Sequence, residues 1–581
     1  MEGKIDPEEL LVSRHRDVHP VDIHARYMTS RVVRSTGSEE VALSKLRRMR
    51  GLARRLAGGL ARWTGREDPS AVAETFFGLE TRRQTFRFRT PEVSGKERLR
   101  RVRALQDRSR RQLSRVQGEG RLRLLVTGGT GFIGKELLSH LARQEDVAEV
   151  VVLIRPKTLY DRGSGEVLEI LDAGQRGDRL LEDLRLPQGV ARERFRFLEG
   201  DVEKPSFGIP SQKREALAGR LTHVIHCAAS VAFDAPYEES FKANVLGTLQ
   251  ALRFSQDLRS RPDSPFVAHL AVETSYIHGR QRREVAREGE LVFPRNYYNN
   301  FYELTKAMAS LETERFLLER DLPVVQLCPS IVIGVAETGN NRGDTKVVNA
   351  PVNVFGRAAT ATSPTLAQWP RSLLMSRLAR VFPGDPTAEI NLISVDRVAA
   401  GILAALRRPQ AVGRRVHLAN DRRIPAAALA RIIREELGVE VKLVDPTLHR
   451  NFGLPLVRRL LRGLKQEGVA RLLDRMNAVF SGYAEWGQPV HEVGNDVALL
   501  GLPAERPDPE RAFRMLCRHN RYVQDFGRVR DPREISRRED LWRRFIEDLE
   551  ERSGAPASSL PAERFRQEVE AGPSPYRPAA G

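Results

Sequence analysis

The sequence has few cysteines and no long apolar run. Its three cysteines, Cys227, Cys328 and Cys517, are too few for a disulfide framework in 581 residues, which indicates a reduced, intracellular protein. No apolar run approaches the roughly 18 residues of a membrane-spanning helix, and the first residues lack the apolar core of a signal peptide. These absences predict a cytoplasmic protein.

Lysine is also scarce: only 12 of the 95 basic residues are lysine, although the net charge is +19. Codon composition can produce such an arginine bias, so the charge alone identifies no partner. An excess of this size suits an anionic substrate, an anionic lipid surface or nucleic acid. Aromatic residues are too sparse in the basic stretches to form a stacking surface for bases. We therefore expect no nucleic-acid partner.

Residues 1–120 are predicted to form a basic helical extension. Residues 41–63 carry apolar side chains at helical spacing with arginines between them, and residues 96–117 form a second basic helical stretch. A basic amphipathic helix can lie on an anionic membrane, which would make the protein peripheral to membranes. The alternative is a helix that packs on its own protein and exposes its basic face.

From residue 121 onward, strands alternate with helices, which predicts a Rossmann-type, doubly wound parallel sheet of the α/β class. We assign residues 121–421 to this domain, since strand patterns fade beyond 422. Its predicted elements include an almost wholly apolar strand at 147–154, a single helix at about 236–254 and a strand at 390–395. Residues 422–553 read as a mainly helical C-terminal region, with an apolar stretch at helical spacing over 454–480 and further predicted helices at 509–521 and 534–552. Residues 554–581, rich in Pro, Ala, Ser and Gly, have the composition of a disordered tail.

A glycine-rich turn follows the first strand of this domain. Gly128, Gly131 and Gly134 are spaced three apart between a buried strand and a helix start near Phe132. Residues without a Cβ allow the backbone to turn tightly and let a pyrophosphate rest on helix amides. A glycine triplet also occurs in strand-to-helix turns that bind nothing, so the remaining motifs have to decide.

The end of the second strand favours NADP. An acidic residue there would hold the ribose 2′-hydroxyl of NAD, whereas this chain has Arg155 and Lys157, which suit a 2′-phosphate. They could also be two surface cations of a basic protein. Asp201, after the third strand, could accept a bond from the adenine amino group or cap its own loop. Ala228 and Ala229, after the fourth strand, are small enough for a strand end that passes a cofactor.

Tyr302 and Lys306 lie four residues apart and share one face of a helix that follows the fifth strand. A neighbouring ammonium and the positive charge of the oxidised nicotinamide would lower the pKa of the Tyr302 phenol and make it a usable proton donor and acceptor. Lys306 could also bond the nicotinamide ribose. A hydroxyl at the end of the fifth strand, from Thr274 or Ser275, would complete a two-donor site for a carbonyl oxygen.

These motifs resemble the extended short-chain dehydrogenase/reductase superfamily. Within it, the sequence is similar to fatty acyl-CoA reductases of the male-sterility type, over roughly residues 120–410. The similar segments are Leu153-Ile-Arg-Pro-Lys157, His226-Cys-Ala-Ala-Ser-Val-Ala-Phe-Asp234, Asn244-Val-Leu-Gly-Thr248, Thr274-Ser-Tyr-Ile-His-Gly279 and Pro329-Ser-Ile-Val-Ile-Gly334. Two positions depart from the family pattern: Glu273 stands where Ser is usual, and Cys328 where Arg is usual.

The resemblance implies a site for each ligand. It makes Tyr302 the proton donor, Lys306 its partner and Thr274 the catalytic hydroxyl, with Ser275 as a rival. The residues implied to hold the dinucleotide are Thr127, Gly128, Thr130, Gly131, Phe132, Ile133, Gly134, Arg155, Lys157, Asp201, Val202, Ala228, Ala229, Lys306, Pro329, Ser330 and Ile331. No metal is implied. Residues 481–527 resemble the family's C-terminal helical region, which helps form the acyl site, so residues 422–553 are implied to be a substrate region.

The resemblance implies NADPH-dependent reduction of an acyl-CoA or acyl-ACP to an aldehyde, and a second reduction would give the alcohol. Two alternatives stay open. A nucleotide-sugar epimerase or dehydratase would use the same Tyr302 and Lys306 with a compact polar sugar pocket. A non-enzymatic, NADP-sensing scaffold with lipid-binding helices would need neither residue.

Overall fold

The computed structural model describes residues 19–22, 85–88, 93–119 and most of 121–526. Within that last range it leaves out 162–165, 185, 187–188, 190–192, 234, 236, 280–284, 291–297, 299, 345–347, 350, 354–380, 446–448, 450–452, 454–456, 458 and 460–487. The predicted basic helix at 41–63, the predicted helix at 534–552, the tail from 554 and almost all of the apolar stretch 454–480 lie outside the described residues.

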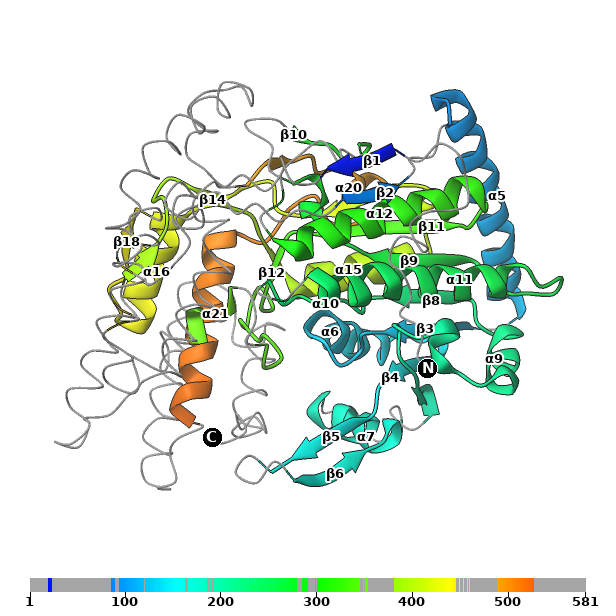
Figure 1. The fold of residues 1–581 in the computed structure, drawn as a ribbon, viewed down its shortest axis with the longest axis horizontal. Coiled ribbons are helices and arrows are strands. Elements are labelled where there is room, and N and C mark those ends of the chain that lie inside the picture. The colour runs from blue at the N-terminus through cyan, green and yellow to red at the C-terminus, as the bar shows by residue number, and fades with distance from the viewer. Residues whose placement is uncertain are drawn as a thin grey trace, which may run out of the picture.

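A seven-stranded parallel sheet forms the centre of the molecule (Figure 1). Its strands lie in the order β16-β11-β9-β8-β3-β4-β7, and every neighbouring pair is parallel. This is the dinucleotide-fold order 3-2-1-4-5-6 with one strand added, so the predicted fold of this domain is confirmed. The strands are β3 (Leu122–Thr127), β4 (Val147–Ile154), β7 (Phe195–Glu199), β8 (His223–His226), β9 (Ala268–Val272), β11 (Val324–Pro329) and β16 (Arg415–Leu418).

Helices cover both faces of the sheet, and the side chains of the central strands alternate between them. On β3, Leu124 and Val126 join one buried cluster, while Leu125 joins the cluster on the other face. The first face is covered by α6 (Phe132–Leu141), α7 (Ala173–Leu184) and α15 (Val395–Ala405); the second by α9 (Ser211–Ala218), α11 (Gly247–Arg259) and α12 (Phe301–Glu319). Burial on both faces explains why these strands read as nearly continuous apolar runs.

The described residues of the N-terminal extension are not wholly helical as predicted, since β1 (His19–Asp22) and β2 (Thr85–Phe88) form an antiparallel strand pair. The extension also includes helix α5 (Gly95–Glu119), which packs across the amino ends of the strands of the main sheet. Its buried stripe includes Val102, Leu105 and Leu113. Ser109 donates to the carbonyl of Val267, just before β9, and Gln106 donates to that of Val412, just before β16. The basic stretch 96–117 is therefore a helix that packs on its own protein.

The predicted strand at 390–395 does not extend the main sheet. It divides into two short strands. β14 (Glu389–Ile390) pairs with β17 (Ile424–Pro425), and β15 (Leu392–Ser394) pairs with β12 (Ile331–Ile333). The other small pairs are β5 (Lys157–Tyr160) with β6 (Val167–Leu171), β10 (Val285–Ala286) with β19 (Val490–His491), β13 (Val381–Pro383) with β18 (Lys442–Val444), and β1 (His19–Asp22) with β2 (Thr85–Phe88).

Beyond the carboxyl ends of the strands lies a second apolar cluster, to which α16 (Ala426–Leu437) and α21 (Pro509–Phe526) contribute. Among the helices that the structure describes, none combines the length and apolar character needed to cross a bilayer.

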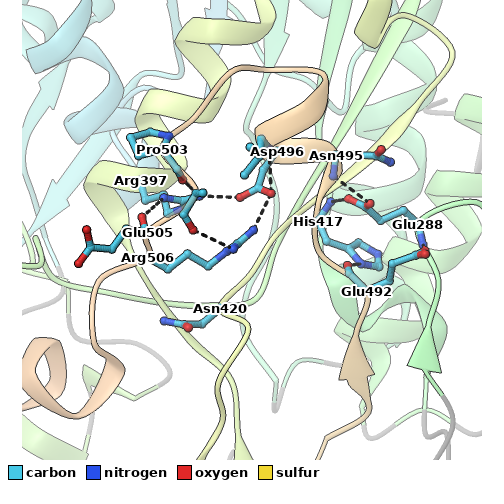
Figure 2. Close-up of polar contacts among 12 residues, drawn as sticks. Glu288, Arg397, His417, Asn420, Glu492, Asn495, Asp496, Pro503, Glu505 and Arg506 are labelled. Atoms are coloured by element: carbon cyan, nitrogen blue, oxygen red, sulfur yellow. Dashed lines mark hydrogen bonds and ion pairs between the residues drawn. The ribbon is translucent and has the colours of Figure 1, made fainter.

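Buried charges anchor the C-terminal segment that leads to α21 (Figure 2). Asp496, in α20 (Asn495–Ala498), is fully buried and accepts from Arg397 and Arg506, at 2.7 Å each. Arg397 also donates to the carbonyl oxygens of Pro503 and Glu505. These bonds, together with the one from Asn495 to the carbonyl oxygen of Arg415, fix the segment against α15 and the edge strand β16.

Candidate active site

The glycine turn is pressed against the end of β8. Gly128 has φ +75°, and a Cβ on it would lie 2.6 Å from the amide nitrogen of Ala228. A Cβ on Gly134 would lie 2.2 Å from the carbonyl oxygen of Gly128. No L side chain fits either position, so the sequence can fold this way only with glycine there.

Helix α6 begins directly after this turn with no side-chain cap at Gly131, its N-cap residue. Thr130 and Gly131 are exposed, while Phe132 and Ile133 are half-buried. The first amides of a helix need acceptors, and its dipole favours an anion. An uncapped N-terminus beside a glycine turn fits the pyrophosphate of a dinucleotide.

Buried side chains hold the ends of β3 and β8 together. The Thr127 hydroxyl lies 2.8 Å from Nδ1 of His226 and accepts from the amide of Ala228 at 3.3 Å. Burial keeps the pKa of His226 well below its usual value, so the ring is neutral. Ala228 and Ala229 are half-buried beside the turn, as expected for residues that pass close to a cofactor.

Two arginines meet at the end of β4. Arg155 is exposed there, and Arg176 of α7 donates to the carbonyl oxygen of Arg155. Burial and the neighbouring charge of Arg155 lower the pKa of Arg176. Lys157 is exposed at the start of β5. Sequence analysis missed Arg176, because an arginine on the next helix of an arginine-rich chain carries no recognisable signal.

Asp201 caps its own loop, one of its two predicted roles. Its Oδ1 accepts from the amide of Glu203 at 3.0 Å and lies 3.9 Å from the Arg155 guanidinium. Burial, followed by the neighbouring Asp201, raises the pKa of Glu203. Val202 packs 3.3 Å from the position that a Cβ on Gly247 would take. An adenine contact by Asp201 stays a prediction.

Tyr302 and Lys306 lie in the first two turns of α12, whose N-cap Asn300 accepts from the amide of Glu303 at 2.9 Å. The ammonium of Lys306 is buried and donates to the carbonyl of Val272, the last residue of β9, at 2.9 Å. The ring of Tyr302 meets that of Phe233 edge-on, with centroids 5.3 Å apart. The structure thus places both predicted residues at the carboxyl end of β9.

The two candidate hydroxyls differ in their surroundings. Thr274 Oγ1 donates to the carbonyl of Pro329 and accepts from the amide of Tyr276, both at 3.3 Å. It also lies near enough to the Tyr302 phenol to lower the pKa of that group. The Ser275 hydroxyl is fully buried and has no partner among the described residues. This geometry favours Thr274 as the hydroxyl that acts with Tyr302.

The expectation that a neighbouring ammonium lowers the pKa of Tyr302 is wrong for the protein alone. Burial raises the pKa of this phenol, and the interaction with Thr274 offsets only part of that rise. Lys306 instead directs its ammonium at a main-chain carbonyl. Tyr302 is therefore held as a neutral phenol, which is the form that donates a proton.

The Pro329–Ile331 stretch, where β11 passes into β12, borders this site. Pro329 accepts from Thr274, and Ile331 begins β12. The Ser330 hydroxyl is buried without a partner in the described part of the chain. A dinucleotide contact by this stretch stays a prediction.

The predicted single helix at 236–254 is instead α10 (Tyr237–Phe241), a π-helical turn (Lys242–Leu246) and α11. Three sets of contacts near the site, the first of them in this π-helical turn, were also not predicted from the sequence. Within that turn, Asn244 bonds both main-chain groups of Ser230 and the Thr305 hydroxyl. The Tyr276 phenol donates to Oε1 of Gln488 at 2.6 Å. The third contact joins the two positions that depart from the reductase pattern: the Cys328 sulfur lies 3.9 Å from Oε2 of Glu273.

Comparisons with known proteins match parts of this chain. Residues 126–402 match the NAD-binding domain family described as Male sterility protein. The chain is 25% identical over 305 residues to fatty acyl-CoA reductase wat of Drosophila melanogaster, covering 48% of this chain and 53% of that protein. It is 32% identical over 139 residues to fatty acyl-CoA reductase 2 of Bos taurus, covering 23% and 25%. The chain therefore spans about half or less of the length of the curated relatives it matches.

Among solved structures, the terminal R domain from the myxalamid PKS-NRPS biosynthetic pathway has a TM-score of 0.54 and 23% identity. The match covers 71% of this chain and 93% of that one, and it shows a shared fold.

Proposed function

We propose that residues 126–402, a male sterility-type NAD(P)-binding domain distantly similar to fatty acyl-CoA reductases, reduce a fatty acyl thioester with NADPH. The observation that carries the proposal is the gathering of Thr274, Tyr302 and Lys306 at one end of β9, the edge of the sheet where the glycine turn also lies. In open α/β sheets, ligands bind at this edge.

The chain's own residues supply positioning and a proton. Thr274 and Tyr302 would donate hydrogen bonds to the thioester carbonyl oxygen and stabilise the charge that develops there. Bound NADPH would supply a hydride to the carbonyl carbon. Tyr302 would give its phenolic proton to the oxygen, and expulsion of the thiol would then leave an aldehyde. Lys306 would orient the nicotinamide ribose.

The residues around the dinucleotide site support NADPH over NADH. Arg155 and Arg176 place two guanidiniums at the end of β4, and no carboxylate occupies the position after Ile154 that would hold an unphosphorylated ribose. The net charge of +19 suits an anionic acyl carrier, either CoA or an acyl-carrier protein. Contact with a membrane surface through residues 41–63 is a further proposal and can be tested with anionic vesicles.

The test is incubation of the chain with NADPH and palmitoyl-CoA, following NADPH loss and thiol release together. We expect one thiol released for each aldehyde formed. Tyr302→Phe should lower kcat by about 10²–10⁴-fold, the usual contribution of a general acid. Tyr298→Phe is the matched control, since this buried phenol donates to the carbonyl of Ile277 instead. Turnover of a UDP- or dTDP-sugar with no turnover of acyl-CoA would contradict the proposal.

A further inference from the structure

We propose that Glu273 is the counter-ion of Lys306 and, through it, a positioning residue of the active site. For its catalytic meaning this inference rests on the proposed function. The electrostatic interaction of the two side chains, which the described structure does not bring into direct ion-pair contact, rests on the arrangement of side chains around the end of β9 and can be tested separately. We refer to it as the charge pair.

Lys306 binds the main chain directly before Glu273. The ammonium of Lys306 donates at 2.9 Å to the carbonyl of Val272, which belongs to the peptide bond joining Val272 to Glu273. Only 2% of Lys306 and 5% of Glu273 are exposed. A buried ammonium is costly unless an opposite charge lies near it, since burial favours its neutral form.

Among the described residues, the other titratable groups that interact with Lys306 are neutral. Burial raises the pKa of the Cys227 thiol to about 12 and raises that of Cys328 well above its usual range. Burial also keeps the pKa of His226 well below its usual value. Burial lowers the pKa of Lys306, and Glu273 is the strongest of the groups that raise it again. Among the described residues around Lys306, the Glu273 carboxylate therefore provides the compensating charge.

Hydrogen bonds fix the Glu273 carboxylate in this position. Gln326 of β11 donates to Oε1 at 3.1 Å, and the Cys328 sulfur lies 3.9 Å from Oε2. The amide oxygen of Gln326 accepts from Arg415 at 3.4 Å. Arg415 also donates to the main-chain carbonyl of Glu290. Oppositely charged groups therefore alternate through the interior: Lys306, Glu273 and Arg415.

The arrangement has a consequence for the proposed chemistry. The Glu273 carboxylate favours the protonated form of Lys306, which can donate to the nicotinamide ribose. If the carboxylate is replaced by a neutral group, burial is no longer opposed and Lys306 loses its proton at lower pH. As the pH is raised, NADPH binding and kcat should then both decline at a lower pH than in the wild-type protein.

Glu273→Gln removes the charge and keeps the shape. Glu273→Ser is a second neutral variant that carries the residue usual in the similar reductases. The dissociation constant of NADPH is measured from pH 6 to pH 11 by fluorescence, alongside kcat and KM for palmitoyl-CoA. Glu273→Asp retains the charge. Glu288→Gln is the matched control, since it removes another buried carboxylate, which bonds main-chain amides beyond Arg415.

For both neutral variants, we expect the alkaline limb of NADPH binding and of kcat to move down by about 1–3 pH units, the usual effect of one nearby opposite charge. KM for palmitoyl-CoA near neutral pH should stay within about twofold. In Glu273→Asp and Glu288→Gln, NADPH binding and kcat should decline at the same alkaline pH as in wild type. The same alkaline decline in a folded neutral variant at Glu273 would overturn the proposal. If the binding limb shifts but wild-type protein reduces no acyl-CoA, the charge pair stands and the proposed function fails.

Discussion

The guanidinium of Arg176 donates a hydrogen bond to the main-chain carbonyl of Arg155, so that two arginines from different elements share the end of β4. Like charges this close repel each other, and the lowered pKa of Arg176 reflects both its burial and the neighbouring Arg155. A bound phosphate would relieve this repulsion.

Arg176→Ala should therefore weaken NADPH binding by about 10–100-fold, the value of a hydrogen bond to a charged group. NADH binding should change little, since NADH carries no 2′-phosphate. Titration with 2′,5′-ADP and 5′-AMP separates the two effects without turnover. Arg179→Ala is the control, because this α7 side chain is 55% exposed and pairs with Glu169. Equal losses for both nucleotides would count against a 2′-phosphate site.

Thr274 and Ser275 give opposite predictions although they are adjacent. Thr274→Ala should lower kcat by about 10²–10³-fold, as expected when one donor to a developing oxyanion is removed. Ser275→Ala should leave kcat nearly unchanged, since its buried hydroxyl has no partner among the described residues. Steady-state kinetics of the two variants with palmitoyl-CoA decides between them, and a larger loss for Ser275→Ala would reverse the assignment.

Asp496→Asn should destabilise the fold strongly. The variant would leave Arg397 and Arg506, with side chains 6% and 8% exposed, without their shared carboxylate (Figure 2). Breaking a buried ion pair in this way costs about 3–5 kcal/mol of the free energy of unfolding. Urea denaturation measures the loss. Arg422→Ala breaks an exposed pair with Asp508 and should cost less than about 1 kcal/mol. Similar losses in both variants would show that the Asp496 cluster does not anchor the segment.

Glu288 should make stability depend on pH. Its carboxylate accepts from the amides of His417 and Asn495, but burial outweighs these bonds and raises its pKa to about 7, from 4.5. Between these values the folded protein keeps a proton that the unfolded chain has lost, so this residue's contribution to stability falls as pH rises across that window. The difference in urea midpoint between wild type and Glu288→Gln should change from pH 4.5 to pH 7. A constant difference would contradict this.

The sheet could be predicted from the sequence because its strands are buried on both faces. Val147–Ile154 was identified as an apolar run and is β4 as expected. The break at Lys242–Leu246 could not be predicted, since apolar spacing does not reveal an extra residue within a helical turn. The separate pairing of β15 with β12 depends on tertiary contacts that local patterns do not encode.

Some residues of the candidate site could be predicted from the sequence, and others could not. Gly128, Arg155, Tyr302 and Lys306 stand in motifs with fixed spacing, so their gathering at one edge followed from the strand order. Arg176 reaches that edge through the packing of α7, and no short-range pattern marks it. The pKa of Tyr302 was expected to fall because Lys306 is near in sequence, whereas burial, which only the folded chain shows, raises it.

The most direct test of the central claim is isotope transfer from NADPH labelled with deuterium at the transferable C4 position. Wild-type chain, labelled NADPH and palmitoyl-CoA are mixed, and the acyl products are analysed by mass spectrometry. If the domain reduces acyl thioesters, the aldehyde will carry one deuterium at C1 and a derived alcohol two. Oxidation of NADPH with no deuterium at C1 of any acyl product would contradict the account.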